Sequence, residues 1–171
     1  MNNAFFIDRD GVINYPVIRN GMPFPPKNLL QLEIFPHVHY ALTLLKNKGY
    51  LLIVVTNQPD VARGTISMAS VEEINLYLKS NLPIDEIKTC YHDKFDGCNC
   101  RKPLPGSIIS AAIKYDINLS TSFMIGDRKS DIEAGRRAGC KTIYIDYGYN
   151  EEKPLIYDFK VTSLLEAAHL I

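Results

Sequence analysis

Residues 50–56, YLLIVVT, form an unbroken apolar run that ends on a hydroxyl side chain. Alternating polarity is absent from this run, so it predicts a strand that is buried on both faces, as in a parallel sheet. Gly49 precedes it directly and is a typical helix stop. Upstream, residues 36–48 carry apolar side chains at helical spacing and predict a helix that packs against the strand: Val38, Ala41, Leu42 and Leu45.

Working outward from this run, strands and helices alternate along the whole chain. Further strands are predicted at 4–8, 87–90, 122–125, 141–145 and 159–161. Helices are predicted at 70–80, where Ser70 and Glu73 fit a capping box, at 106–115, at 130–138, and after Ser163, which with Glu166 fits a second box. Residues 11–35 are expected to be irregular. The alternation predicts an open, Rossmann-like α/β fold with a parallel sheet and helices on both faces, in a single domain spanning residues 1–171.

Composition excludes several classes of function. Lys plus Arg and Asp plus Glu both number 19, and no dense basic run occurs, so a nucleic-acid partner is not expected. No apolar stretch approaches the roughly 20 residues of a membrane-spanning helix. The N-terminus has no basic region before Asp8, unlike a signal peptide. We therefore expect a cytoplasmic protein without a membrane partner.

Polar side chains follow the apolar strands at the point where each strand ends. In open α/β sheets, ligands bind in the crevice beyond the carboxyl ends of the strands. Independent segments therefore predict one shared site, formed by the residues that close four strands: Asp8, Thr56 and Asn57, Cys90 and His92, and Gly126 and Asp127.

Each polar segment also has an ordinary structural explanation when it is taken alone. The carboxylates of Asp8 and Asp10 would be brought together by a turn at Gly11, but such a turn can simply be acidic. The Asp and Ser residues of 126–131, GDRKSD, are common helix N-caps. Residues 101–103, RKP, can be solvated surface, and 56–58, TNQ, a turn after a strand.

Taken in order, these four segments resemble the four motifs of the haloacid-dehalogenase superfamily, over about residues 4–146. Finer features are similar to D-glycero-D-manno-heptose 1,7-bisphosphate 7-phosphatases: DRDGVIN at 8–14, ARG at 62–64, and a Cys-x-His…Cys-x-Cys-Arg-Lys-Pro pattern. Histidinol-phosphate phosphatases are near relatives of that family and share the cysteine-rich loop. Such a protein has the haloacid-dehalogenase-like fold, and this chain is too short for the separate cap domain that many members carry.

The resemblance implies magnesium-dependent hydrolysis of a phosphate monoester through an aspartyl phosphate. Asp8 would be the nucleophile, and Asp10 the general acid and base. Two anions must approach each other, so Mg²⁺ is expected, held by Asp8, Asp127 and the backbone carbonyl of Asp10. Lys102 and Thr56 would hold the oxygens of the transferred phosphoryl group.

Supporting roles are expected for four more residues. Asp131 would orient Lys102, and Asn57 would position Asp10 or the phosphate. Arg101 is the first candidate for a contact to substrate outside the transferred phosphate. Arg63 is a second candidate, although it could equally be a solvated loop charge.

Residues 90–100 contain the ligand set of a closed structural zinc site: Cys90, His92, Cys98 and Cys100. Reduced core cysteines are the alternative, but the segment is too polar to be buried. A zinc ion here would anchor the loop that delivers Arg101 and Lys102. Cys140 stands apart and is expected to be a small buried apolar side chain.

The substrate is the least determined feature. Loops at 11–35, 58–69 and 91–101 would shape the pocket, and some of their residues depart from the heptose-phosphatase pattern: Pro59, Asp60 and Tyr91. The first expectation is conversion of heptose 1,7-bisphosphate to heptose 1-phosphate by a monomer. Histidinol phosphate or another small sugar phosphate is the alternative, and polynucleotide 3′-phosphate is disfavoured by the balanced charge. A zinc-stabilised, non-catalytic binding protein is the alternative from another class, disfavoured because the acidic motifs and Lys102 are intact.

Overall fold

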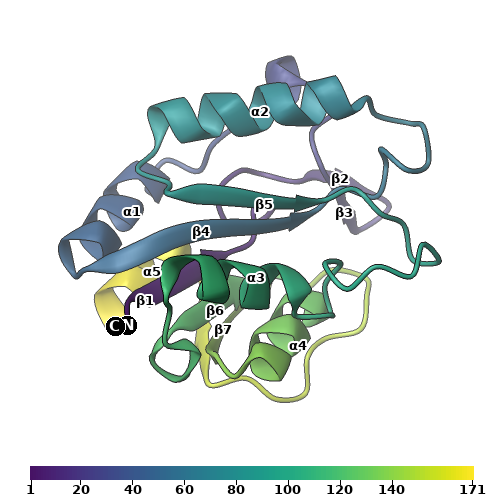
Figure 1. Cartoon of the computed structure of the whole chain (residues 1–171). Helices are drawn as coiled ribbons and strands as arrows, with labels where there is room; N and C mark the ends of the chain where they lie inside the picture. Colours follow the sequence, from purple (N-terminus) through teal and green to yellow (C-terminus); the bar gives the residue numbers. More distant parts are fainter.

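A six-stranded parallel sheet forms the centre of the computed structural model, which describes all residues from 1 to 171 (Figure 1). Every pair of neighbouring strands runs parallel. The strands, in spatial order, are β5 (Glu86–Cys90), β4 (Tyr50–Asn57), β1 (Asn3–Ile7), β6 (Phe123–Gly126), β7 (Lys141–Ile145) and β8 (Phe159–Val161).

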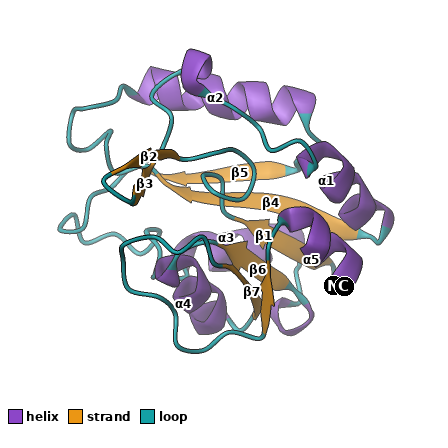
Figure 2. Ribbon diagram, turned by 180° about the vertical axis from the view of Figure 1, so that it is seen from behind, coloured by secondary structure: helices purple, strands orange, loops and turns teal.

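Helices cover both faces of the sheet (Figures 1 and 2). One face packs against α1 (Val38–Asn47), α2 (Met68–Asn81) and α5 (Leu164–Leu170). The other face packs against α3 (Gly106–Tyr115) and α4 (Lys129–Ala138). None of these helices is both long and apolar enough to cross a membrane.

The continuous apolar strands follow from this two-sided packing. In β1, Phe5 and Ile7 enter the core beneath α1, α2 and α5, whereas Ala4 and Phe6 enter the core beneath α3 and α4. Successive side chains of a strand point to opposite faces, so a strand between two helical layers needs an apolar residue at every position. The predicted open parallel α/β sheet with helices on both faces and no separate cap is confirmed.

One of the two predicted helix starts is wrong and the other is confirmed. Helix α2 begins at Met68, because the Ser67 side chain accepts a hydrogen bond from the backbone N–H of Ser70 at 3.0 Å. The predicted capping box at Ser70 is therefore wrong. Helix α5 does begin after Ser163, whose hydroxyl accepts from the backbone N–H of Glu166 at 3.1 Å.

Residues 11–35 are more regular than expected. They contain a hairpin of β2 (Val17–Arg19) and β3 (Met22–Phe24), followed by a 3₁₀ turn at Leu29–Gln31. Asn20 and Gly21 both have positive φ, of 51° and 74°, at the hairpin turn. An Asn-Gly pair is a strong sequence signal for this kind of turn, so the prediction of an irregular segment was wrong at these residues.

Helix α4 approaches the sheet closely at Gly135, and this contact can be tested. A Cβ atom on Gly135 would lie 2.6 Å from Cβ of Met124 in β6. Because that atom is attached directly to the strand backbone, the helix would have to move away. Gly135→Ala is expected to lower the free energy of unfolding by about 1–3 kcal/mol, as other overpacked cores do, measured by urea denaturation.

The neighbouring Arg136→Ala is the control, because Arg136 is exposed on the same helix. Its free energy of unfolding is expected to stay within about 0.5 kcal/mol of the parent protein. Equal stability of the two variants would contradict the close packing of α4.

Candidate active site

A cluster of buried charged side chains lies at the carboxyl end of the sheet. Asp8 follows β1, Asp127 follows β6, and Asp131 lies in the first turn of α4. Lys102 comes from the loop between β5 and α3 and is also buried. A small pocket opens above this cluster, and its walls include Asp10, Asn57, Arg128 and residues 23–25 at the end of the β2–β3 hairpin.

Lys102 is the centre of the cluster. Its Nζ lies 2.6 Å from Asp8 Oδ1, 2.7 Å from Asp131 Oδ1 and 2.7 Å from the backbone carbonyl of Val55. Burial alone would lower the pKa of Lys102, but the nearby Asp131 and Asp8 carboxylates outweigh it and raise the pKa. The side chain therefore stays charged. The expected contact between Asp131 and Lys102 is present, and the second oxygen of Asp131 accepts from the Arg128 backbone N–H at 3.0 Å.

The charges of this cluster do not balance. Asp8, Asp127 and Asp131 have carboxylate oxygens within 4.8 Å of one another. Three carboxylates and the one ammonium of Lys102 leave a formal charge of −2. Burial, followed by the charge of Asp131, raises the pKa of Asp8 to about 7, and burial with the charge of Asp8 raises the pKa of Asp127 well above its usual range.

A divalent cation fits these residues. Oδ1 of Asp127 is buried and has no hydrogen-bond partner. The backbone carbonyl of Asp10 accepts no backbone hydrogen bond. Both oxygens of Asp131 are already used, so Asp8, Asp127 and the Asp10 carbonyl are the oxygens available to a hard cation such as Mg²⁺.

Asp10 is held by donors that the sequence analysis did not assign. Gln58 Nε2 lies 2.8 Å from Asp10 Oδ2, and Asn14 Nδ2 lies 2.9 Å from Oδ1. Arg9, which is fully buried, contacts Oδ2 at 3.2 Å and also binds Asn75 of α2 at 3.0 Å. Arg9, Asn14 and Gln58 stand within the motifs themselves, but spacing alone does not say which of their side chains turns toward Asp10.

Asn57 was expected to position Asp10 or the phosphate; it lines the pocket, but it does not contact Asp10. Its amide donates to the backbone carbonyl of Lys102 at 3.0 Å and accepts from the backbone N–H of Lys102 at 3.1 Å. The contact with Asp10 is made by Gln58 instead, and the same Gln58 amide also donates to the Thr56 hydroxyl at 2.9 Å. Asn57 thus fixes the backbone that carries the buried lysine.

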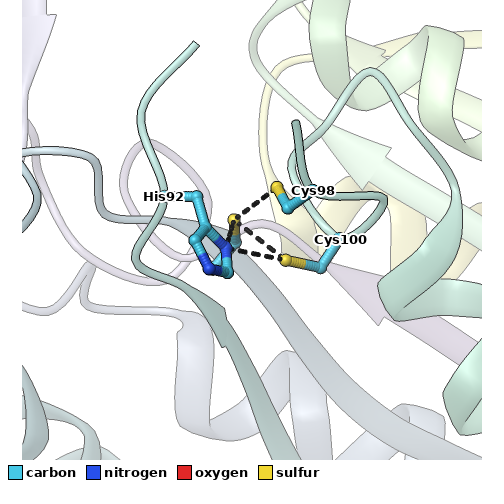
Figure 3. A group of neighbouring side chains, drawn as sticks. His92, Cys98 and Cys100 are labelled. Atoms are coloured by element: carbon cyan, nitrogen blue, oxygen red, sulfur yellow. Dashed lines mark hydrogen bonds between the residues drawn. The ribbon is translucent and has the colours of Figure 1, made fainter. Parts of the chain in front are cut away.

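The cysteine-rich loop gathers its four predicted ligands. Cys90 Sγ lies 3.2 Å from Cys100 Sγ and 3.8 Å from Cys98 Sγ, and His92 Nδ1 lies 3.3 Å from Cys100 Sγ. Figure 3 shows His92, Cys98 and Cys100 turned toward one another. A tetrahedron of Zn–S bonds about 2.3 Å long has edges of about 3.8 Å, so these residues fit a zinc ion.

The remaining cysteine lies apart from both clusters, and the two arginines lie near the cysteine-rich loop. Cys140 is buried and free, in the core beneath α3 and α4. A second, wider cleft, called the outer cleft, shares Asn57, Lys102 and Arg128 with the small pocket. Arg101 lines this outer cleft and donates to the His92 carbonyl at 3.3 Å. Arg63 lines the same cleft, but its guanidinium pairs with Asp93 at 2.7 Å and with Asp60 at 3.3 Å.

Comparison with known proteins identifies the family of this chain. Residues 99–167 match the HAD-hydrolase-like family. The D-glycero-beta-D-manno-heptose-1,7-bisphosphate 7-phosphatase of Helicobacter pylori is 37% identical over 82% of this chain and 81% of its own length. The D-glycero-alpha-D-manno-heptose-1,7-bisphosphate 7-phosphatase of Campylobacter jejuni is 33% identical over 88% of this chain and 84% of its own length.

A solved structure shares the whole fold. D,D-heptose 1,7-bisphosphate phosphatase from B. bronchiseptica, complexed with magnesium and phosphate, superposes with a TM-score of 0.78 at 26% identity. The match covers 98% of this chain and 97% of that one.

The chain therefore belongs to the haloacid-dehalogenase superfamily and, within it, to the family of the heptose 1,7-bisphosphate 7-phosphatases. It is a phosphoric monoester hydrolase, and the predicted superfamily, enzyme class and family resemblance are confirmed. This membership favours the enzyme over a non-catalytic binding protein.

Gly11 offers a test of the magnesium site. Gly11 has a φ of +98°, and a Cβ atom there would lie 1.9 Å from Oδ2 of Asp127. Gly11→Ala is therefore expected to displace the Asp127 carboxylate and abolish Mg²⁺ binding, measured by titration calorimetry on the zinc-loaded protein.

Gly139→Ala is the matched control. Gly139 has a similar φ of +91°, but nothing lies within 4 Å of its Cβ position. Both variants should lose about 1–2 kcal/mol of stability through backbone strain, and only Gly11→Ala should lose the metal. Normal Mg²⁺ binding by Gly11→Ala would contradict the assignment of Asp127.

Proposed function

We propose that this enzyme hydrolyses D-glycero-D-manno-heptose 1,7-bisphosphate to heptose 1-phosphate and inorganic phosphate. The observation that carries the proposal is the buried contact of Asp8 with Lys102 at the floor of a cleft whose outer wall is cationic. The names of the relatives in Helicobacter pylori and Campylobacter jejuni support the same substrate, one for the beta and one for the alpha anomer.

The reaction would proceed in two displacements on phosphorus. An oxygen of Asp8 attacks the 7-phosphate, and the bond between phosphorus and the sugar oxygen breaks while Asp10 donates a proton to that oxygen. Water then attacks the phosphorus of the aspartyl phosphate while Asp10 accepts a proton from that water. The bond between phosphorus and the Asp8 oxygen breaks, which releases phosphate and regenerates the Asp8 carboxylate and the protonated Asp10. Asp10 is held in reach of the cleft by Arg9, Asn14 and Gln58.

Charge must be neutralised as the carboxylate and the phosphate approach. Lys102 supplies one positive charge, and Asp131 and Asn57 hold it in place. Thr56 would contribute its hydroxyl to the phosphoryl oxygens. Mg²⁺ bound by Asp8, Asp127 and the Asp10 carbonyl would supply the remaining charge compensation.

The outer cleft, about 400 Å³ in volume, favours a second phosphate on the substrate. Asp60 is its only acidic residue, whereas its basic residues are Arg63, Lys94, Arg101, Lys102 and Arg128. Such a wall attracts a bisphosphate and repels the cationic amine of histidinol phosphate. Arg101 is the proposed contact of the second phosphate, since Arg63 is already paired with Asp93 and Asp60.

A structural zinc ion bound by Cys90, His92, Cys98 and Cys100 is part of the proposal. It would fix the loop at Cys100, and Asn57 holds the same loop two residues later at Lys102. Catalytic groups need placement to within roughly half an ångström, which a long polar loop does not provide alone. The monomeric state and the cellular location stay predictions.

Loss of zinc should therefore disturb both stability and turnover. Cys98→Ser is expected to lower bound zinc, measured by mass spectrometry of metals, together with the melting temperature and kcat. Cys140→Ala is the control, because Cys140 is a free cysteine outside the zinc loop, and it should keep its zinc. Full activity and full thermal stability of zinc-free Cys98→Ser would remove the proposed role of the ion.

The substrate is tested by comparing kcat/KM for the α and β anomers of heptose 1,7-bisphosphate with histidinol phosphate and fructose 1,6-bisphosphate. We expect one of the heptose esters to have the highest value. Asp8→Asn should fold, keep its zinc and lose turnover on the order of 10⁴- to 10⁶-fold, as when other covalent nucleophiles are removed. A preference for histidinol phosphate, or an active Asp8→Asn enzyme, would contradict the proposal.

A further inference from the structure

The loop between β7 and β8 reaches the active site, although none of its residues was assigned a role from the sequence. The Tyr149 hydroxyl donates a hydrogen bond to Asp127 Oδ2 at 2.8 Å. Two residues earlier, the Tyr147 hydroxyl donates to the backbone carbonyl of Gly11 at 3.0 Å. Two tyrosines of one loop therefore touch two different motifs of the site.

Contacts with three separate segments hold this loop in place. Glu151 accepts a hydrogen bond from Arg128 Nε at 2.9 Å, next to the start of α4. The backbone N–H of Asn150 donates to the carbonyl of Gly21 in the hairpin turn at 3.1 Å. The Tyr147 ring stacks near Phe35, with 6.4 Å between ring centroids. The Tyr149 hydroxyl thus has a defined position relative to Asp127.

The two oxygens of the Asp127 carboxylate have different surroundings. Oδ2 accepts from Tyr149, whereas Oδ1 is buried without a hydrogen-bond partner. A carboxylate that is held through one oxygen presents the other in a fixed direction. Groups that bind a metal-ligating side chain from behind tune its orientation in this way.

Tyr149 is well suited to this position because it is neutral. The carboxylates of Asp8 and Asp131 repel the Asp127 carboxylate. The ammonium of Lys102 forms its ion pairs with Asp8 and Asp131. A phenol has an ordinary pKa of about 10, so the Tyr149 hydroxyl is a neutral donor at neutral pH. The hydroxyl satisfies one carboxylate oxygen without adding a cation that would compete with the metal.

We propose that Tyr149 is a positioning residue of this phosphatase, which holds Asp127 by Oδ2 so that Oδ1 is directed to bind Mg²⁺. The inference rests on the proposed function, in which Asp127 is a magnesium ligand. Tyr149 itself touches neither the metal nor the phosphate. Loss of the Tyr149 hydroxyl would lower the affinity for Mg²⁺ directly. Turnover would fall only because less Mg²⁺ is bound.

Tyr149→Phe tests the inference, because it removes the hydroxyl and keeps the ring that packs on Tyr147. Mg²⁺ binding to the full-length, zinc-loaded protein is measured by titration calorimetry without substrate. We expect a Kd about 10- to 100-fold higher than that of the parent protein, the usual effect of losing such a supporting contact. The Mg²⁺ concentration for half-maximal activity should rise by a similar factor, and excess Mg²⁺ should restore most of kcat.

Tyr157→Phe is the matched control from the same loop. Its ring packs on Tyr144, with 5.5 Å between centroids, and its hydroxyl makes no hydrogen bond. This variant should bind Mg²⁺ like the parent protein. A purely structural role of Tyr149 would lower the melting temperature but leave the Mg²⁺ affinity unchanged, and that result overturns the inference.

Asp127→Asn tests the proposed magnesium site separately from the proposed role of Tyr149. If Asp127→Asn loses Mg²⁺ binding and Tyr149→Phe binds it like the parent protein, the role of Tyr149 is wrong and the metal site stands. If Asp127→Asn still binds Mg²⁺ normally, the proposed metal ligand is wrong and the inference about Tyr149 fails with it.

Discussion

The buried contact between Lys102 and Asp8 is the constraint on which the rest of the structure depends. Removing two charges from water costs several kcal/mol per ion, and only close partners offset that cost. Asp131 and the Val55 carbonyl complete the set of partners around the ammonium. The Asn57 amide fixes the backbone of the loop that delivers Lys102, and four zinc-type ligands lie close together at Cys90 to Cys100 in the same loop. A lysine held this firmly would bind a phosphate group in one defined position.

The apolar sheet explains why the site needs a metal. The central strands β1, β4 and β6 are covered on both faces, so the residues at their carboxyl ends lie on an apolar core with little water to screen their charges. Three carboxylates with one lysine remain negatively charged there, and the pKa values of Asp8 and Asp127 rise in response. The same excess of negative charge that makes this arrangement costly makes it selective for a divalent cation. Phosphate can then be bound beside a carboxylate that would otherwise repel it.

Roles of neighbouring residues were harder to predict than the position of the site. Asn57 and Gln58 are adjacent, yet one binds the Lys102 backbone and the other binds Asp10. The strand ends at Asn57, and beyond it the alternation that directs side chains no longer holds. Arg9 lies between Asp8 and Asp10 in the sequence, and its buried guanidinium reaches Asn75 on α2, far along the chain. The spacing of residues along the sequence does not predict such a contact.

The sequence by itself determined the parallel sheet, the ends of its strands and the zinc-type ligand group, because apolar periodicity, strand-terminal polar residues and short Cys and His spacings are local properties. Only the tertiary structure decided which donor meets which carboxylate, and it brought the β7–β8 loop to the site, where Tyr149 binds Asp127. The physical reason is the short range of a hydrogen bond, which changes partner within about an ångström. That precision is set by the packing of α4, the β2–β3 hairpin and the loop against one another, and no single segment encodes it.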